Sequence, residues 1–230
     1  MRGVRVADAE TAAARAKSLL LGIIASTPRT RLAVPGGRTP GRIFELLAAS
    51  PRLLRDVEIL FADERAVPLD DPESNYRLLK EKLLDPLGPG APRVIPMRAD
   101  GSDLESAARA YERELARPLT IVLLGVGEDG HIASLFPRSP LLDDEERRVA
   151  AVFDSPKPPA RRLTLTPRAL AEAESICVVA TGAGKREAVA RALREDGDEH
   201  DCPARLVRDA FWIVDEDAAA GLDASILSRE

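Results

Sequence analysis

The sequence has few of the residues that build disulfide frameworks, metal sites or membrane spans. It contains two cysteines, Cys177 and Cys202, without the paired short spacings of a structural zinc site. We expect one to be buried and the other to lie at the surface. No stretch approaches the roughly twenty apolar residues that span a bilayer. A short apolar run near the start follows Asp8, Glu10 and Arg15, which is typical of an amphipathic helix rather than a signal peptide. We therefore expect a cytoplasmic protein that does not bind membranes.

The charges also lack a bias toward one sign. Lysine and arginine number 33 against 38 aspartate and glutamate residues, and the formal net charge is -5. Such a chain has no broad positive field, so we expect no nucleic-acid partner. A small anion is still a possible ligand, because an anion site needs only a few local cations and N–H donors. With 45% hydrophobic residues the chain can bury a substantial core, and we expect one domain, residues 1–230, and a monomer.

Short apolar runs alternate with stretches of helical spacing, which predicts an α/β fold with a mostly parallel sheet. Ligands bind beyond the carboxyl ends of the strands in such sheets, so the polar clusters that follow three of the strands should converge on one site. Segments rich in glycine and proline, 87–92 and 155–159, are expected to be surface loops. The predicted strands are 31–34, 58–61, 119–125, 175–180 and 210–214, and the predicted helices are 8–24, 40–49, 74–84, 103–115 and 185–193.

The first polar cluster is Gly36-Gly37-Arg38-Thr39-Pro40, between a predicted strand and a predicted helix. Paired glycines let backbone N–H groups approach a ligand. With Thr39 as the helix cap and Pro40 in the first turn, the loop would form an anion site at a helix N-terminus. A tight turn that needs glycine only for its backbone angles explains the segment equally well. Arg38 favours phosphate, because a guanidinium beside free N–H groups suits that ligand.

Two further clusters carry charge. Asp63-Glu64-Arg65, with Asn75 soon after, could bind sugar hydroxyls and place a cation beside developing negative charge, although charge clusters at loop starts are usually solvated ion pairs. Arg162 precedes an apolar strand-like run, and Lys185 opens a helix after a glycine-bearing turn. Taken singly, these two are an arginine on a surface strand and an ordinary helix start. Together with the first cluster they would add cations to one phosphate pocket.

The strongest cluster is the segment 125–137, where an apolar strand runs into a glycine-rich turn carrying Asp129 and His131. Histidine titrates near neutrality and is the commonest general base, and Asp129 could orient its ring or bind substrate. A hydrogen-bonded structural histidine is the ordinary alternative, but this position favours catalysis. The segment also matches G-x-G-x-x-G. Asp129 would crowd the phosphate position and no acidic ribose partner follows, so we expect no dinucleotide cofactor.

Other chemistries at this turn have weaker support. His131 with Asp129, Asp63 and Glu64 could supply metal ligands, but the chain has only one other histidine and no H-x-x-x-H spacing. We predict no metal and no other cofactor. Ser134 does not lie in a G-x-S-x-G elbow, so it is not predicted to be a nucleophile.

In this order the segments resemble the motifs of the 6-phosphogluconolactonase family, within the wider group that includes glucosamine-6-phosphate isomerase (deaminase). The resemblance covers essentially the whole chain. It implies a three-layer αβα fold with a Rossmann-like sheet. It also implies hydrolysis of a sugar-phosphate lactone, 6-phospho-D-glucono-1,5-lactone, in the oxidative pentose phosphate pathway. The matching segments are 36–40, 63–65, 67–68, 74–75, 125–137, 162–166 and 182–185.

Two positions separate the branches of this group. The isomerase branch typically has tyrosine after Asp-Glu and a Phe-Asn-Glu-Pro run after Asp-Gly-His, whereas this chain has Arg65 and Ser134-Leu135-Phe136-Pro137. Phe136 cannot transfer a proton, so the isomerase mechanism loses a participant and the hydrolytic one does not. Arg38 stands where the family often has serine, which leaves the phosphate contacts of that loop open.

The resemblance then implies a role for each residue. His131 is the general base, Arg65 stabilises the oxyanion with help from N–H groups around Gly127 to Gly130, and Asp129 orients His131 or a sugar hydroxyl. A glucosamine-6-phosphate isomerase and a non-catalytic sugar-phosphate sensor are the alternatives, but no DNA-binding segment is evident, and a sensor has no evident use for His131 beside Asp129. The expected substrate or phosphate contacts are Gly36, Gly37, Arg38, Thr39, Asp63, Glu64, Asn75, Gly127, Gly130, Ser134, Arg162 and Lys185.

Overall fold

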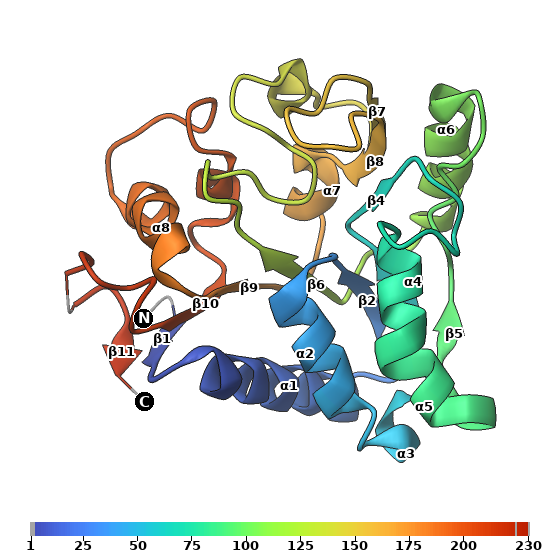
Figure 1. Cartoon of the computed structure of the whole chain (residues 1–230), viewed down its shortest axis with the longest axis horizontal. Coiled ribbons are helices and arrows are strands. Elements are labelled where there is room, and N and C mark those ends of the chain that lie inside the picture. Colours follow the sequence, from blue (N-terminus) through green and yellow to red (C-terminus); the bar gives the residue numbers. More distant parts are fainter. Residues whose placement is uncertain (1–2, 224, 230) are drawn as a thin grey trace.

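The fold is built on an eight-stranded sheet in which every neighbouring pair of strands is parallel. The computed structural model describes residues 3–223 and 225–229. This sheet confirms the α/β class (Figure 1). In spatial order the strands are β11 (Ser228–Arg229), β1 (Gly3–Val6), β10 (Phe211–Asp215), β9 (Ile176–Ala180), β6 (Ile121–Gly125), β2 (Arg31–Val34), β3 (Glu58–Phe61) and β5 (Arg93–Val94).

A second, three-stranded antiparallel sheet was not predicted. It has the order β4 (Asp63–Arg65), β8 (Arg162–Leu165), β7 (Val149–Val152). Its strands have three or four residues, too short for an alternating pattern to stand out in the sequence. The pairing has a functional consequence, because it sets Arg65 opposite Arg162 and so joins two clusters that lie far apart in the sequence.

Helices lie on both sides of the large sheet. In Figure 1, α1 and α2 lie on one side of the line of strands β10, β9 and β6, and α7 and α8 lie on the other, as expected for a three-layer fold. Asp8 begins α1 by accepting a hydrogen bond from the backbone N–H of Thr11 at 2.8 Å. None of the helices in the described ranges is both long and apolar enough to cross a membrane. The α-helices are α1 (Ala9–Ser26), α2 (Arg38–Leu47), α3 (Pro51–Leu54), α4 (Asn75–Leu79), α5 (Asp85–Leu87), α6 (Leu104–Glu114), α7 (Pro167–Ala171) and α8 (Arg186–Leu193), with a π-helical turn at Lys80–Leu84 between α4 and α5.

The apolar side chains form one continuous core, with Trp212, Phe44 and Phe61 among its largest buried members. Burying one such side chain contributes roughly 1.5–3 kcal/mol. Both cysteines belong to this core, so the expectation that one lies at the surface was wrong. Cys202 is 2% exposed and packs beneath the turn that follows β6. The prediction of a single domain for residues 1–230 stays a prediction, and one shared core is compatible with it.

The strand order places a crevice between β2 and β6. From β2 the chain adds β3 and β5 on one side, and β6, β9 and β10 extend the sheet on the other. Connections that leave in opposite directions open a space beyond the carboxyl ends of the two central strands. The glycine pair Gly36-Gly37 follows β2, and the turn with Asp129 and His131 follows β6, so both clusters border this space.

Candidate active site

A pocket of about 800 Å³ lies at the carboxyl ends of the parallel strands. Loops that follow β1, β2, β3, β6, β9 and β10 all contribute to its wall, so the sequence clusters converge as their positions in the fold require. The lining includes the predicted residues Gly36, Gly37, Arg38, Thr39, Asp63, Arg65, Asn75, Gly127, His131, Arg162 and Lys185.

His131 lies in this wall with its ring held from one side. Its Nδ1 is 2.5 Å from Asp129 Oδ1, and its ring packs against Phe136 with 4.6 Å between ring centroids. A carboxylate at Nδ1 favours the tautomer that carries its proton there. The nitrogen left to accept a proton is therefore Nε2, for which the described residues supply no hydrogen-bond partner. This is the arrangement that a general base needs.

Two glycines shape the turn that carries this pair. The backbone N–H of Gly127 donates to the carbonyl of His131 at 2.8 Å, and a Cβ on Gly127 would overlap the side chains of both His131 and Asp129. Gly130 has a φ of 90°, and a Cβ there would lie 2.7 Å from Cys202 Sγ. Gly127 therefore makes room for the pair, and Gly130 lets the turn close against the core.

The charge of Asp129 is stabilised by its neighbours. Burial raises the pKa of Asp129, but the hydrogen bond and charge of His131, together with the charge of Lys157, outweigh it and hold that pKa well below its ordinary value. Lys157 Nζ lies 3.5 Å from Asp129 Oδ1, and Lys157 also lines the pocket. Sequence reasoning missed Lys157, because its segment, 155–159, reads only as a surface loop rich in proline.

The loop after β2 offers backbone donors to the pocket. Helix α2 begins at Arg38, with Gly37 at its N-cap in a left-handed conformation with a φ of 112°. Thr39 is not the cap, contrary to the prediction. Its hydroxyl instead lies 2.9 Å from that of Thr181, which ties this loop to the one after β9. The first N–H groups of a helix have no partner within it, so this end of α2 can bind an anion.

Asn75 packs behind the same loop. A Cβ on Gly36 would overlap the amide of Asn75, whose Nδ2 donates to the carbonyl of Asp63 at 2.8 Å. Gly36 is therefore required by the close approach of Asn75, and Asn75 joins the loop after β2 to the strand β4.

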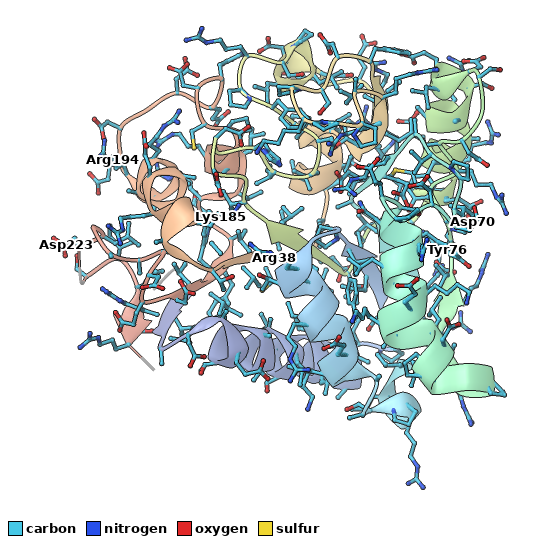
Figure 2. All side chains as sticks on the ribbon, in the orientation of Figure 1. Arg38, Asp70, Tyr76, Lys185, Arg194 and Asp223 are labelled. Carbon is cyan, nitrogen blue, oxygen red and sulfur yellow. The ribbon has the colours of Figure 1, made fainter. Side chains whose placement is uncertain are left out.

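Positive charge gathers in the pocket near the start of α2, where Arg38, Lys157 and Lys185 all line the wall. Figure 2 shows Arg38 at the beginning of α2 and Lys185 just before α8, both beside the carboxyl end of the sheet. Burial lowers the pKa of Lys185; the charge of Glu128 partly opposes this, and the charges of Lys157 and Arg38 lower the pKa further. Like charges placed this close together are stabilised when an anion lies between them.

Arg65 and Asp63 enter the pocket from β4. Arg65 donates through Nη1 to the carbonyl of Glu73, while its Nε is buried and has no partner in the part of the chain that the structure describes. Asp63 Oδ2 accepts a hydrogen bond of 2.7 Å from the Ser134 hydroxyl. A guanidinium in the pocket wall is well suited to a charge that develops on the substrate.

The pocket lining does not include Glu64, Asp129, Gly130 or Ser134, so direct substrate contacts of these residues stay predictions. Side chains alternate along a strand, which sends Glu64 away from the face that Asp63 and Arg65 share. Glu64 is fully buried and accepts hydrogen bonds from the backbone N–H groups of Arg65, Asn75 and Tyr76. Burial raises the pKa of Glu64, and these donors oppose the rise.

Arg162 lines the pocket, but its Nε and Nη2 groups donate to backbone carbonyls rather than into the pocket. It is 4% exposed, and its Nε and Nη2 donate to the carbonyls of Pro159, Pro158 and Lys157 at 3.0 to 3.1 Å. Its Nη1 lies 3.4 Å from the Ser134 hydroxyl. The phosphate role of Arg162 stays a prediction. These contacts with the protein backbone point to a further, structural role.

Metal-ligating side chains do not cluster in the described residues, where no group of three or more histidine, cysteine, aspartate or glutamate side chains could hold an ion. The second histidine, His200, lies outside the pocket wall. Its Nδ1 lies 3.0 Å from Asp198 and its Nε2 2.9 Å from Asp143.

The model of the glucosamine-6-phosphate isomerases/6-phosphogluconolactonase family matches residues 5–214. The chain belongs to this family. A 6-phosphogluconolactonase of Streptomyces coelicolor is 37% identical over 95% of this chain and 92% of its own length. For a human 6-phosphogluconolactonase the identity is also 37%, over 92% of this chain and 86% of the relative.

Two solved structures share the fold of this chain. A 6-phosphogluconolactonase of Trypanosoma brucei, 26% identical, superposes with a TM-score of 0.84 over 97% of this chain and 100% of its own. A monomeric glucosamine-6-phosphate deaminase, 22% identical, has a TM-score of 0.80 over 95% of this chain and 99% of its own. At that identity the likeness concerns the fold alone, so the choice between the two activities rests on the site and the closer relatives.

Proposed function

We propose that this chain hydrolyses 6-phospho-D-glucono-1,5-lactone to 6-phosphogluconate in the oxidative pentose phosphate pathway. The observation that carries the proposal is His131, which lines the pocket and lies 2.5 Å from Asp129 behind it, in the same pocket as a helix N-terminus and a group of cations. A base beside an anion site is what hydrolysis of a phosphorylated lactone requires. The relatives of similar length named above carry the same activity in their names.

The reaction is a general-base hydrolysis. His131 Nε2 takes a proton from water as the water oxygen bonds to C1 of the lactone, and Asp129 stabilises the imidazolium through Nδ1. The C1 carbonyl becomes an oxyanion beside Arg65. When the tetrahedral intermediate collapses, the bond between C1 and the ring oxygen breaks, and His131 returns the proton to that oxygen. One base and one oxyanion donor contribute roughly 10²–10³-fold each.

The phosphate on C6 is bound without changing during the reaction. Arg38, Lys185 and the N–H groups at the start of α2 hold it, since these groups combine positive charge with unused donors. Asn75 keeps the loop at Gly36 in place, and Asp63, held by Ser134, accepts a sugar hydroxyl.

Phe136 favours hydrolysis over the isomerase reaction. Its ring packs on His131 with 4.6 Å between centroids, and Phe136 is 4% exposed. An apolar ring beside the base can neither donate nor accept a proton, so ring-opening chemistry has no second acid–base group at this position. The water-activating role of His131 is unaffected.

A direct assay separates the candidate activities. Freshly generated 6-phosphogluconolactone, followed in a pH-stat, should be hydrolysed well above its spontaneous rate, and glucosamine 6-phosphate should release no ammonia. Ammonia release without lactone hydrolysis would establish the isomerase instead, and tight binding of the lactone without turnover would indicate a sensor. We further propose that the enzyme is a cytoplasmic monomer that uses no metal or other cofactor. Loss of activity in EDTA, restored by one divalent ion, would overturn the metal-free mechanism.

A further inference from the structure

One arginine fixes the shape of the loop that joins β7 to β8. Arg162 donates to the carbonyls of three consecutive residues, Lys157, Pro158 and Pro159, at 3.0, 3.1 and 3.0 Å. Within the loop, the Ser155 hydroxyl donates to the Lys157 carbonyl at 2.7 Å. Proline has no N–H to donate, so Arg162 supplies donors that the loop backbone lacks.

The loop in turn carries Lys157 to the reacting pair. Lys157 Nζ is 3.5 Å from Asp129 Oδ1, the same oxygen that lies 2.5 Å from His131 Nδ1. The Lys157 side chain is 44% exposed, whereas that of Arg162 is 5% exposed. The position of the ammonium group therefore depends chiefly on the backbone beneath it, which Arg162 holds.

We propose that Arg162 and Lys157 are positioning residues for the general base, a proposal that rests on the proposed function. Arg162 fixes the loop, the loop presents Lys157 to Asp129, and Lys157 holds the carboxylate against the His131 ring. Asp129 Oδ1 is then held by an N–H and by an ammonium group together, which restricts the carboxylate and keeps Nε2 aimed into the pocket.

The competing assignment makes both residues phosphate ligands, and it has a different kinetic signature. A cation that binds an unchanging phosphate contributes equally to ground state and transition state, so its loss raises KM. A residue that orients the base acts on the chemical step, so its loss lowers kcat. Lys157 is the deciding residue, since it lies near both Asp129 and Lys185.

The test is a double-mutant cycle on the lactone assay with Arg162→Gln, Lys157→Met and the double variant. Each single change should lower kcat roughly 10-fold with KM changed less than about 2-fold. Because the two residues act in series, the double variant should lose no more than the worse single variant. Losses that multiply, or a change confined to KM, would overturn the proposal.

The chain offers a matched control in Arg161, the exposed neighbour of Arg162, which donates to the carbonyl of Ser102 and lies over Phe153. Arg161→Gln should leave both kinetic parameters unchanged. Lys157→Arg keeps the charge and should recover most of the lost kcat. If Arg162→Gln fails to fold by circular dichroism, the two Lys157 variants decide alone: no drop with methionine, or no recovery with arginine, would overturn the proposal.

A readout without substrate separates this proposal from the proposed function. The chain has only two histidines, so the ring nitrogens of His131 can be followed by ¹⁵N NMR, with His200, whose partners are Asp143 and Asp198, as internal reference. Lys157→Met and Arg162→Gln should shift the His131 Nδ1 signal and leave His200 unchanged. An unshifted His131 signal contradicts the positioning role whether or not the wild-type chain hydrolyses the lactone. An inactive wild-type chain contradicts only the function.

Discussion

The turn after β6 and the loop after β2 both border the pocket, but they hold their functional groups in different ways. In the turn, His131 and Asp129 bond to each other, and Gly127 closes the backbone around them. In the loop, the groups offered are N–H donors at the start of α2 and the charge of Arg38, and the described residues supply no partner for the backbone N–H groups of Arg38 and Thr39. A general base needs its accepting nitrogen in a fixed orientation relative to the substrate, whereas an anion site needs positive charge and hydrogen-bond donors without partners.

The largest effect that sharpens this comparison is expected at Arg65. Its proposed partner is a charge that exists only in the tetrahedral transition state, so Arg65→Ala should lower kcat roughly 10²–10³-fold with a smaller change in KM. Steady-state kinetics on the phosphorylated lactone, with circular dichroism to establish folding, measures this. An Arg65 variant that changes only KM would assign Arg65 to binding and leave the oxyanion to backbone donors.

Gly127→Ala tests whether the turn needs its exact shape. A Cβ at this position overlaps the side chains of His131 and Asp129, so the pair must shift, and a displacement of about 1 Å can cost roughly 10²-fold in kcat. Gly22 is the control, because a Cβ there meets nothing within 4 Å and Gly22 does not line the pocket. Gly22→Ala should keep most of the activity. Equal losses in the two variants would show that the effect is not specific to the pair.

Lys185→Met should behave in the opposite way to Arg65→Ala. If Lys185 binds a phosphate that does not change in the reaction, its loss should raise KM roughly 10-fold and leave kcat nearly unchanged. Inorganic phosphate, used as a competitive inhibitor, should lose affinity by a similar factor. A fall in kcat at constant KM would place Lys185 with the reacting group and break the division between turn and loop.

The smallest effect is expected in stability. The pKa of Asp129 in the folded chain lies below its ordinary value of 3.8, so its ionised form stabilises the fold above that pH, and the contribution disappears as the pH falls through the lowered value. The side chain is 32% exposed, so solvent screening limits the contribution to about 1 kcal/mol or less. Urea unfolding of Asp129→Asn against wild type should show the difference at pH 7 and a shrinking one below about pH 4. A stability difference that grows toward low pH would contradict a stabilising role for the ionised Asp129.

Local sequence patterns predicted the parts of the site that are built locally. The five predicted strands are all present, and the ranges 31–34 and 58–61 match β2 and β3 residue for residue, because buried parallel strands are continuous apolar runs. The turn with Asp129 and His131 was also recognisable, because it is formed by residues that are close together in the sequence. The pair lies two residues apart, beside glycines that the geometry requires.

The features that were missed depend on contacts between distant segments. Nothing in the sequence near Lys157 indicates that Arg162 folds the loop toward Asp129. The face to which Glu64 points is set by the pairing of β4 with β8, a strand of only four residues. The burial of Cys202 follows from the turn at Gly130 lying over it. Each of these outcomes depends on packing between distant segments, which the residue types and spacing within one segment do not reveal.

The central claim is that His131 is the base, and His131→Ala tests it most directly. With fresh 6-phosphogluconolactone, kcat should fall roughly 10²-fold or more, because no second histidine lies in the pocket wall to replace the base. Affinity for inorganic phosphate should be unchanged, since the anion site is built by α2, Arg38 and Lys185. Near-normal turnover in the folded variant would contradict the account.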